Sequence, residues 1–561
     1  MAKVILGKVA ISWKKIYDSS MTYSAQDVVS YNNQCYICTT DGTTGAFNLN
    51  FWELVTNSPI NFASNEFDLI YKNENNQLSV LPIGNDDSVL GIDHFTKSPS
   101  WQPLQFQLGS RIQRFANECG QDSIESSCFV IDTNDRLRAW GNNSHFHLGI
   151  GSNPANEMLP VHVAFPQDFP GVSKFYSSME SYLGVIDNEG KWWTWGKSST
   201  GGFVGSNISS DIYVPVCLST DSSSSIYNKT IVQSTQKIDS VSNKYNNMLL
   251  DSNGEVHYVG FFGHYQTLPF TKTNYENFST DFSLTSVIKQ IASTGYQENA
   301  TYYMLTNGGV VYSFGFGGNG ERGDASLTNQ TAFSVFSVVL SGVEKIYGAP
   351  GQGYAIDTNG KLYAWGKNNV GQLGTSDTVN RNTPTPTSIF DGTNHKAIDV
   401  YFNNGDVYRT TIVTAVNSSN INETYYCGND FGTAGNKQAF TKINALDGKV
   451  ITKVACVGGN GSTNTITALF LTSANEIYTI GFGSYGQIGN GEGNTTTVIQ
   501  ELIHIGKDIN IIDIHGFGHN EYSGFCLLDE NGRLFYMGAG TNMKSADDDN
   551  FHKFTLQEVV F

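Results

Sequence analysis

Short apolar runs separated by turn residues repeat along most of the chain. In "YAIDTNGKLYAWG", residues 354–366, two strand-length runs flank the turn Asp-Thr-Asn-Gly. Runs of this length that are rich in aromatic and branched residues are typical of β-strands. Asn-Gly between two such runs is a strong hairpin signal, because both residues accept a positive φ. Each segment of this kind therefore predicts an antiparallel hairpin.

The second run of each hairpin ends in an apolar or aromatic residue followed by glycine. Eight such pairs occur, and their glycines are spaced by 51 to 64 residues: Trp140-Gly141, Trp195-Gly196, Val259-Gly260, Phe314-Gly315, Trp365-Gly366, Cys427-Gly428, Ile480-Gly481 and Met537-Gly538. A period longer than one hairpin indicates an array of equal supersecondary units.

Two further apolar runs complete each unit. One lies upstream, as in "VEKIYGAPG", and one lies downstream, often after a proline, as in "TPTSIF". Proline suits an outer edge strand, where its missing N–H costs no ladder hydrogen bond. Four short antiparallel strands per unit predict the blades of a β-propeller. The predicted fold class is therefore all-β: residues 106–561 form a propeller of seven or eight four-stranded blades, with eight favoured by the hairpin count. The last run, "FTLQEVVF", is predicted to be the outer strand of the final blade or to close the ring on the first blade.

Composition agrees with a turn-rich β protein and excludes several classes of function. The chain has 561 residues, 58 glycines and only 15% charged residues. Its net charge is −18 with 33 Lys and Arg in total, which argues against nucleic acid as a partner. The chain has no polybasic tract and no long apolar run, so we expect neither binding to a membrane surface nor insertion into a membrane. The N-terminus lacks the features of a signal peptide, so we expect a protein made in a cytoplasm and not exported by the general secretory route.

The motifs that could carry chemistry are weak. G-x-G-x-x-G occurs at 315–320 and 481–486, at one position of the repeat, and β-type sequence follows it in place of the required helix. Cys35 and Cys38 form the single C-x-x-C, and residues three apart on a strand point to opposite faces. His145 and His147 share a loop without a third ligand. The sequence thus predicts no catalytic residue, no metal site and no cofactor. Two carboxylates brought together by folding, as in a glycosidase, remain an alternative that spacing does not test.

The first 57 residues differ from the repeats. Aromatic residues are scattered through residues 13–55, and "DVVSYNNQCYICT" predicts a hairpin with Asn32-Asn33 at its turn. A domain this small has a tiny core, so its aromatic rings serve both as packing and as surface. The candidate rings for stacking on a sugar are Trp13, Tyr23, Tyr31, Tyr36 and Trp52. The spacing of Tyr31 and Tyr36 around the hairpin predicts that at most one of them faces a ligand. The predicted division is a β module at 1–57, a linker with a short β element at 58–105, and the propeller at 106–561.

Two resemblances follow from these residues. The repeat "GKLYAWG" with "GQLG" at 360–374, echoed by "GQIG" at 486–489, resembles that of the regulator-of-chromosome-condensation propellers. The familiar members have seven blades, and their nucleotide-exchange and chromatin-binding roles do not carry over to an acidic chain without an identifiable exchange loop. The N-terminal pattern Trp13, Tyr23, Asp27-Val28-Val29, Tyr31, Tyr36 and Trp52 resembles small carbohydrate-binding modules of the chitin-binding type. Gln26 stands where that pattern has glycine, and Cys35 and Cys38 are additions.

Modules of this type are common in bacteriophage tail and fibre proteins. The combination predicts a non-enzymatic bacteriophage virion protein, such as a tail fibre, spike or external decoration, assembled in the host cytoplasm. Its expected roles are recognition of a host-surface glycan and particle assembly, and its expected partners are other virion subunits, a host glycan and further copies of itself. One alternative is a glycan depolymerase that acts from the propeller channel. Another is a purely structural virion subunit that the module docks.

Overall fold

The computed structural model describes residues 12–25, 27–32, 34–56, 69–72, 78–81, 88–92, 99–103, 112–116, 121–122, 127–143, 146–151, 156–177, 182–196, 212–222, 224, 226–235, 246–260, 287–296, 299–329, 337–403, 405, 407–433, 435–459, 464–502, 509–518, 523–539 and 553–559. The chain divides into two compact units, Met1–Ser110 and Arg111–Phe561. The first part of the predicted linker, residues 58–68, lies outside the described residues.

The first unit contains a four-stranded sheet in the order β1 (Ser12–Ile16), β2 (Asp27–Tyr31), β3 (Gln34–Cys38) and β4 (Trp52–Thr56). β1 pairs in parallel with β2, and the other neighbours are antiparallel. The predicted hairpin is confirmed: β2 ends at Tyr31, β3 begins at Gln34, and Asn32 has a φ of 50°. Two hairpins follow, β5 (Leu69–Lys72) with β6 (Leu78–Leu81) and β7 (Ser88–Ile92) with β8 (Pro99–Pro103).

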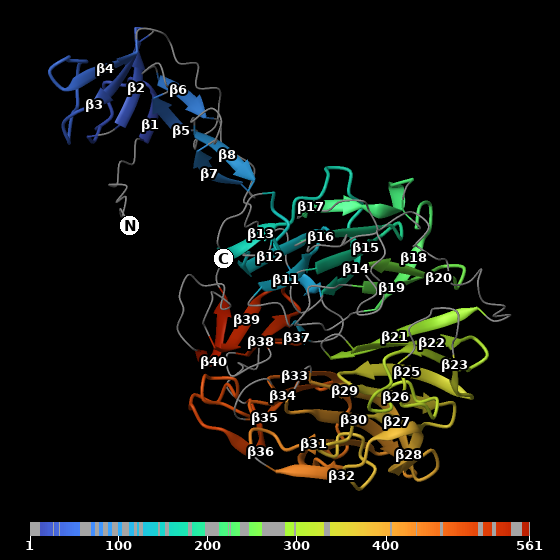
Figure 1. Cartoon of the computed structure of the whole chain (residues 1–561). Helices are drawn as coiled ribbons and strands as arrows, with labels where there is room; N and C mark the ends of the chain where they lie inside the picture. Colours follow the sequence, from blue (N-terminus) through green and yellow to red (C-terminus); the bar gives the residue numbers. More distant parts are fainter. Residues whose placement is uncertain are drawn as a thin grey trace. The chain divides into compact units, whose positions relative to one another are not determined.

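The second unit is an all-β propeller of eight blades, each a separate sheet whose successive strands are antiparallel, apart from the short strand β10 described below (Figure 1). The strands of blades 1 to 4, from inner to outer, are β9 (Ile112–Phe115), β11 (Ser127–Asp132), β12 (Leu137–Asn142) and β13 (Asn156–His162); β14 (Val172–Ser177), β15 (Tyr182–Asp187), β16 (Trp192–Gly196) and β17 (Ile212–Cys217); β18 (Ile231–Ser234), β19 (Asn246–Asp251) and β20 (Val256–Gly260); and β21 (Ile288–Tyr296), β22 (Asn299–Thr306), β23 (Val311–Gly315) and β24 (Ser337–Leu340).

Blades 5 to 8 contain β25 (Val343–Ala349), β26 (Gln352–Asp357), β27 (Lys361–Gly366) and β28 (Arg381–Asp391); β29 (His395–Phe402), β30 (Thr410–Asn417), β31 (Asn422–Asn429) and β32 (Asn436–Lys442); β33 (Ile451–Val457), β34 (Thr467–Thr472), β35 (Ile477–Gly481) and β36 (Thr496–Glu501); and β37 (Ile511–Phe517), β38 (Gly524–Asp529), β39 (Leu534–Gly538) and β40 (Lys553–Val559). Helical structure in the described residues is limited to short 3₁₀ turns such as η1 (Leu218–Thr220) and η3 (Asn444–Leu446). None of those residues forms a helix long and apolar enough to cross a membrane.

The ring closes between blade 8 and blade 1. β40 pairs with β39 as the outer strand of blade 8, which confirms the first of the two places predicted for the last run. A two-residue strand from blade 1, β10 (Gln121–Asp122), pairs in parallel with the inner strand β37 of blade 8. One apolar cluster spans the seam, with Ile112, Phe115, Cys128, Val130 and Trp140 from blade 1 and Phe517, Cys526, Leu528, Leu534 and Tyr536 from blade 8. The closure thus combines backbone pairing with side-chain packing.

Each hairpin between the second and third strands ends in a turn built on one side chain. In blade 5, Asp357 Oδ1 accepts the backbone N–H groups of Asn359 and Lys361 at 2.8 and 2.9 Å. Gly360 donates its N–H to the Asp357 carbonyl and has a φ of 86°, whereas Asn359 keeps a negative φ. The predicted hairpin is present, and only the glycine of the Asn-Gly pair uses the positive φ that both residues accept. The turn is a type I turn followed by one left-handed residue, which explains why Asp135, Asn420 and Asn475 can replace the glycine in other blades.

The aromatic-glycine pairs join neighbouring blades. The Trp195 indole N–H donates to the carbonyl of His147 in blade 1 at 2.7 Å, and the Trp365 N–H donates to the carbonyl of Glu321 in blade 4 at 2.9 Å. Trp140, Trp195 and Trp365 are at most 1% exposed, so all three rings are buried. A Cβ on Gly366 would lie 2.4 Å from the Gly351 carbonyl oxygen, so only glycine fits after the tryptophan. The repeated pair is therefore a packing device.

Candidate functional site

The aromatic residues of the N-terminal module form one cluster with a buried layer and a half-buried layer. Tyr23, Tyr36 and Trp52 are 0%, 7% and 3% exposed and make up the core with Val29 and Cys38. Trp13 lies on β1 opposite Val28, and its side-chain environment is outside the description. Burial thus assigns three of the five predicted stacking rings to packing, because a covered ring has no free face for a sugar.

Tyr31, Tyr17 and Phe47 form the half-buried layer, named here the ring trio. Tyr31 and Phe47 stack with their ring centroids 4.0 Å apart. The ring centroid of Tyr17 lies 5.1 Å from that of Phe47 and 5.7 Å from that of Tyr31. Trp52 supports the trio from the core, at 5.5 Å from both Tyr17 and Phe47. Tyr31 is half-buried and Tyr36 is buried, in agreement with the expectation that at most one of this pair faces outward.

Two exposed loops surround the ring trio and are tied to each other. Tyr17 donates its hydroxyl to the Gly45 carbonyl at 2.5 Å, and Gly45 N–H donates to Ser19 O at 3.3 Å. Burial against neighbouring rings raises the pKa of Tyr17, so its hydroxyl stays protonated at neutral pH. The exposed residues of these loops include Ser20, Thr44 and Asn48. Hydroxyl and amide groups therefore border the rings.

Sequence reasoning did not single out Tyr17 or Phe47 as site residues. Both lie in loops, so no strand alternation signals which way their rings point. Their exposure follows from the contact between the loop after β1 and the loop before β4, which is fixed by the pairing of Tyr23 with Thr43. The sequence shows that the two residues are aromatic. Only the fold shows that their rings lie together.

In the propeller, one polar side chain per inner strand links neighbouring blades. Each of these residues follows a β-bulge near the start of its strand: Arg114, Lys174, Gln233, Gln290, Lys345, Asp399, Lys453 and Asp513. Gln290 accepts the N–H of Ile346 at 3.0 Å and donates to its carbonyl at 2.8 Å, as a neighbouring strand would. Lys453 pairs with Asp513 at 2.5 Å, and Asp513 accepts the Phe115 N–H at 3.4 Å across the seam. These inner polar groups are committed to holding the ring together.

Asp251, Glu255 and His257 in blade 3 are close enough to share a metal ion. The cation position is already filled, since Lys229 Nζ lies 2.5 Å from Glu255 and 3.6 Å from Asp251. His257 Nε2 lies 3.1 Å from Asp251, as Arg138 Nε lies from Asp132 in blade 1. Burial lowers the pKa of His257, so the imidazole is neutral and donates this hydrogen bond. The cluster thus supports the hairpin turn of blade 3, and other blades support the same turn with other residues.

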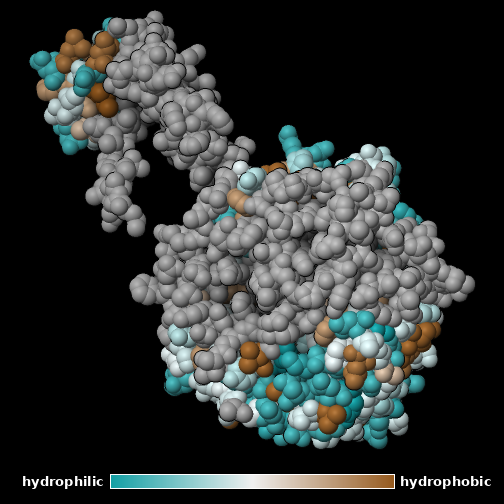
Figure 2. Space-filling model, viewed as in Figure 1, coloured by the Kyte–Doolittle hydropathy of each residue, from teal (hydrophilic) through white to brown (hydrophobic). Residues whose placement is uncertain are grey.

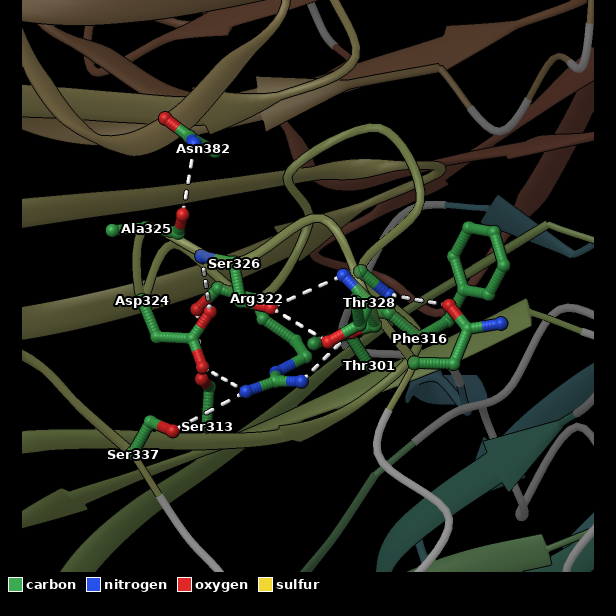
Figure 3. Close-up of polar contacts among 12 residues, drawn as sticks. Thr301, Ser313, Phe316, Arg322, Asp324, Ala325, Ser326, Thr328, Ser337 and Asn382 are labelled. Atoms are coloured by element: carbon green, nitrogen blue, oxygen red, sulfur yellow. Dashed lines mark hydrogen bonds and ion pairs between the residues drawn. The ribbon is translucent and has the colours of Figure 1, made fainter.

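The loop after the third strand of blade 4 contains a buried ion pair (Figure 3). Arg322 donates to the Thr328 carbonyl at 2.8 Å and to Ser337 Oγ at 3.3 Å, and it also pairs with Asp324. Both charged side chains are 4% exposed. In blade 5 the same space is filled by Asn368, whose amide donates to the Val379 carbonyl at 3.2 Å and accepts the Leu373 N–H at 2.9 Å. The polar groups of both loops therefore form hydrogen bonds within their own blade and stabilise the loop conformation.

The two remaining motifs also have structural roles. His147 is fully buried, and its carbonyl accepts the Trp195 indole, while His145 lies outside the described residues. Cys38 is buried and donates its thiol to the Thr40 carbonyl at 3.1 Å.

Comparison with known proteins identifies the repeat. Residues 359–402 match the model of the regulator of chromosome condensation (RCC1) repeat, so the propeller carries repeats of this type. The chain is 28% identical over 189 residues to the E3 ubiquitin-protein ligase HERC2 of Mus musculus, which is 33% of this chain and 4% of that protein. It is 23% identical over 204 residues to the ultraviolet-B receptor UVR8 of Arabidopsis thaliana, which is 36% of this chain and 44% of that protein. The chain thus spans less than half the length of either relative.

Solved structures with a similar arrangement include human WBSCR16, with a TM-score of 0.48 and 15% identity, covering 70% of this chain and 100% of that one. Prp20p of Saccharomyces cerevisiae gives a TM-score of 0.47 and 19% identity, covering 68% of this chain and 88% of that one. The eight-bladed architecture described above rests on the strand pairing of this chain itself.

Proposed function

We propose that this chain is a non-enzymatic binding protein on the exterior of a bacteriophage particle. The N-terminal module attaches to a host-surface glycan or to another virion subunit, and the propeller is the rigid body that it carries. The observation that carries the proposal is the half-buried ring trio, which forms an aromatic surface supported by a packed core. Aromatic faces stack on ring-shaped ligands without requiring a catalytic group.

The propeller supports a binding role over the depolymerase alternative. Its described inner polar side chains hold neighbouring blades together, and the strand β10 adds to the inner strand of blade 8. A glycosidase needs two free carboxylates about 5 to 10 Å apart in a cleft. One relative, which the chain matches over 204 residues at 23% identity, is named as a receptor.

Attachment to a particle explains how weak contacts suffice. A single module of this size buries little of a glycan, but several copies on one particle multiply the contacts, because later binding events become intramolecular. The resemblance of the module to those of tail and fibre proteins supports the virion location and the assembly in a host cytoplasm.

Two measurements test the proposal. Gold-labelled antibodies against the full chain should decorate the outside of purified particles in electron micrographs. The purified full chain should bind extracted host-surface polysaccharide without releasing new reducing ends. Labelling confined to cell debris would contradict the virion location, and a steady rise in reducing ends would establish the depolymerase instead.

A further inference from the structure

We infer that the ring trio, Tyr17, Tyr31 and Phe47, is the contact surface for an uncharged carbohydrate chain. This inference deepens the proposed function and rests on its glycan-binding part. It moves the sugar site away from Tyr23, Tyr36 and Trp52, whose rings are covered by the core.

The rings of the trio are fixed in place before a ligand arrives. Phe47 is held by a stacking contact with Tyr31 at 4.0 Å and an edge contact with Tyr36 at 4.8 Å. Tyr17 is stacked on Tyr23 at 5.2 Å, and its hydroxyl is held by the Gly45 carbonyl. Rings that are already ordered lose little entropy on binding, so a small contact area is enough for a measurable affinity.

The hydroxyl of Tyr31 differs from that of Tyr17. Tyr36 donates to Gln34 and Tyr17 donates to Gly45, whereas the described residues offer no hydrogen bond to the Tyr31 hydroxyl. Tyr31 thus presents part of a flat ring together with a hydroxyl group that is free to meet a ligand. A pyranose has the matching chemistry, with apolar C–H groups on one face and hydroxyls around its edge.

The charges of the module select the kind of sugar. Residues 1–57 contain four carboxylates, Asp18, Asp27, Asp41 and Glu53, and four lysines, two of which lie on β1, so the module has no net charge. Asp18, Asp41 and Glu53 are exposed. A module without net charge offers no overall electrostatic attraction to a uronic acid or a sulfated sugar. The hydroxyl and amide rim of Ser20, Thr44 and Asn48 suits an uncharged chain.

A neighbouring apolar strip offers a matched control. Leu49, Phe51 and Leu54 are 67%, 41% and 44% exposed, and Phe51 makes none of the ring contacts that join the trio. The space-filling view shows apolar side chains gathered on this module (Figure 2). Phe51 is more exposed than any ring of the trio, so a general apolar attraction would depend on Phe51, whereas an oriented site depends on Tyr31.

The experiment uses the full chain and isothermal titration with two uncharged probes, the hexamers of β-1,4-linked N-acetylglucosamine and of β-1,4-linked glucose. We expect Tyr31→Ala to weaken binding of the better probe roughly 5- to 150-fold, the range for loss of one stacking ring. Tyr31→Phe should weaken it less, because the ring stays and only the hydroxyl is lost. Phe51→Ala should leave the affinity unchanged. Near-ultraviolet circular dichroism checks that each variant keeps its aromatic packing.

The outcomes separate the inference from the proposal on which it rests. If the unaltered chain binds neither probe nor any sugar on a printed glycan array, the glycan-binding part of the proposed function fails. If the unaltered chain binds and Tyr31→Ala binds equally well, or if Phe51→Ala abolishes binding, the ring trio is not the site. Should Tyr31→Ala unfold the module, Tyr31→Leu keeps apolar volume without a flat face. Full affinity in that folded variant would overturn the inference, and a loss of affinity would support it.

Discussion

The blade 4 loop that contains Arg322 can be rebuilt by substitution to resemble the corresponding loop of blade 5. The change in folding free energy can be worked out by comparing the contacts of the two loops. Gly317, Arg322 and Asp324 of blade 4 occupy the positions of Asn368, Leu373 and Thr375 in blade 5. In blade 4 a guanidinium reaches the loop carbonyl of Thr328, and in blade 5 the amide of Asn368 reaches the corresponding carbonyl of Val379. The two loops thus satisfy the same carbonyl position with different donors.

Arg322→Leu alone should be severely destabilising. It leaves the Asp324 carboxylate, which is 4% exposed, without its guanidinium partner, although the carboxylate still accepts the Ser326 N–H at 3.1 Å. Removing one partner of a buried ion pair costs about 3 to 5 kcal/mol. Gly317→Asn together with Asp324→Thr, in the presence of Arg322, should be equally poor, because the new Cβ lies 3.1 Å from Arg322 Cδ and the guanidinium loses its carboxylate.

The triple variant, Gly317→Asn with Arg322→Leu and Asp324→Thr, should recover most of this loss. The introduced amide can then donate toward the Thr328 carbonyl, and the introduced hydroxyl takes the place that Thr375 has beside Asn368. Gly317 has no positive φ, so asparagine suits its backbone conformation, but the Thr328 backbone oxygen would lie 2.8 Å from the new Cβ, so the loop backbone must shift. We expect the triple variant to lie within about 2 kcal/mol of the unaltered chain, and the changes to be strongly non-additive, as is usual for residues in contact.

The assay is amide hydrogen exchange of peptides that cover residues 315–329, because a propeller of this size need not unfold in one step. Faster exchange in Arg322→Leu and slower exchange in the triple variant would give the local free energies directly. Peptides from blade 7, which has Gly483, Ile488 and Asn490 at the same positions and no ion pair there, serve as the internal reference. A cost below about 1 kcal/mol for Arg322→Leu, or a triple variant no better than the single one, would refute the reasoning.

Two further predictions concern the junction of blades 4 and 5. Trp365→Phe should lower stability by about 1 kcal/mol for the lost indole hydrogen bond to the Glu321 carbonyl plus a packing loss, and calorimetry should show a lower melting temperature; an unchanged melting temperature would mean that the bond contributes nothing. Glu321→Gln should stabilise the chain at pH 8 by about 0.5 to 2 kcal/mol, because burial raises the pKa of Glu321 and the hydrogen bonds from Asn319 only partly offset it. A carboxyl group with a raised pKa in the folded state contributes stability at low pH, and that stability is lost as the pH rises through the folded-state pKa. The stability advantage of Glu321→Gln should therefore shrink toward pH 4. An advantage that grows on acidification would contradict this sign.

The repeats could be predicted because their signals are local. Asp-x-Asn-Gly between apolar runs and the aromatic-glycine pair both act within one hairpin, so counting them gave eight blades. The sequence predicted the hairpin but not its turn type, because the Asp357 side chain accepts the two N–H groups that decide the backbone conformation.

Features that depend on distant residues left no readable signal. β10 pairs with a strand almost 400 residues further along the chain, and two residues are too few to form a pattern. The replacement of the Asn368 amide by the Arg322 guanidinium cannot be read from aligned positions, because Asn368 aligns with Gly317 and Arg322 with Leu373. In the module, sequence reasoning identified the aromatic cluster but could not separate Tyr23 from Tyr17, because which ring is covered depends on how two loops meet.

The seam between blades 1 and 8 has a consequence for synthesis on the ribosome. Phe115 and Asp513, which meet across it, are separated by 398 residues. At roughly 5 to 20 residues per second, the early partner waits about 20 to 80 s for the late one to be translated. During that time Val130 and Trp140 lack the blade 8 side of their cluster. A nascent ring therefore emerges as an open arc whose first blade exposes apolar side chains, and exchange of last blades between neighbouring chains on one messenger competes with closure.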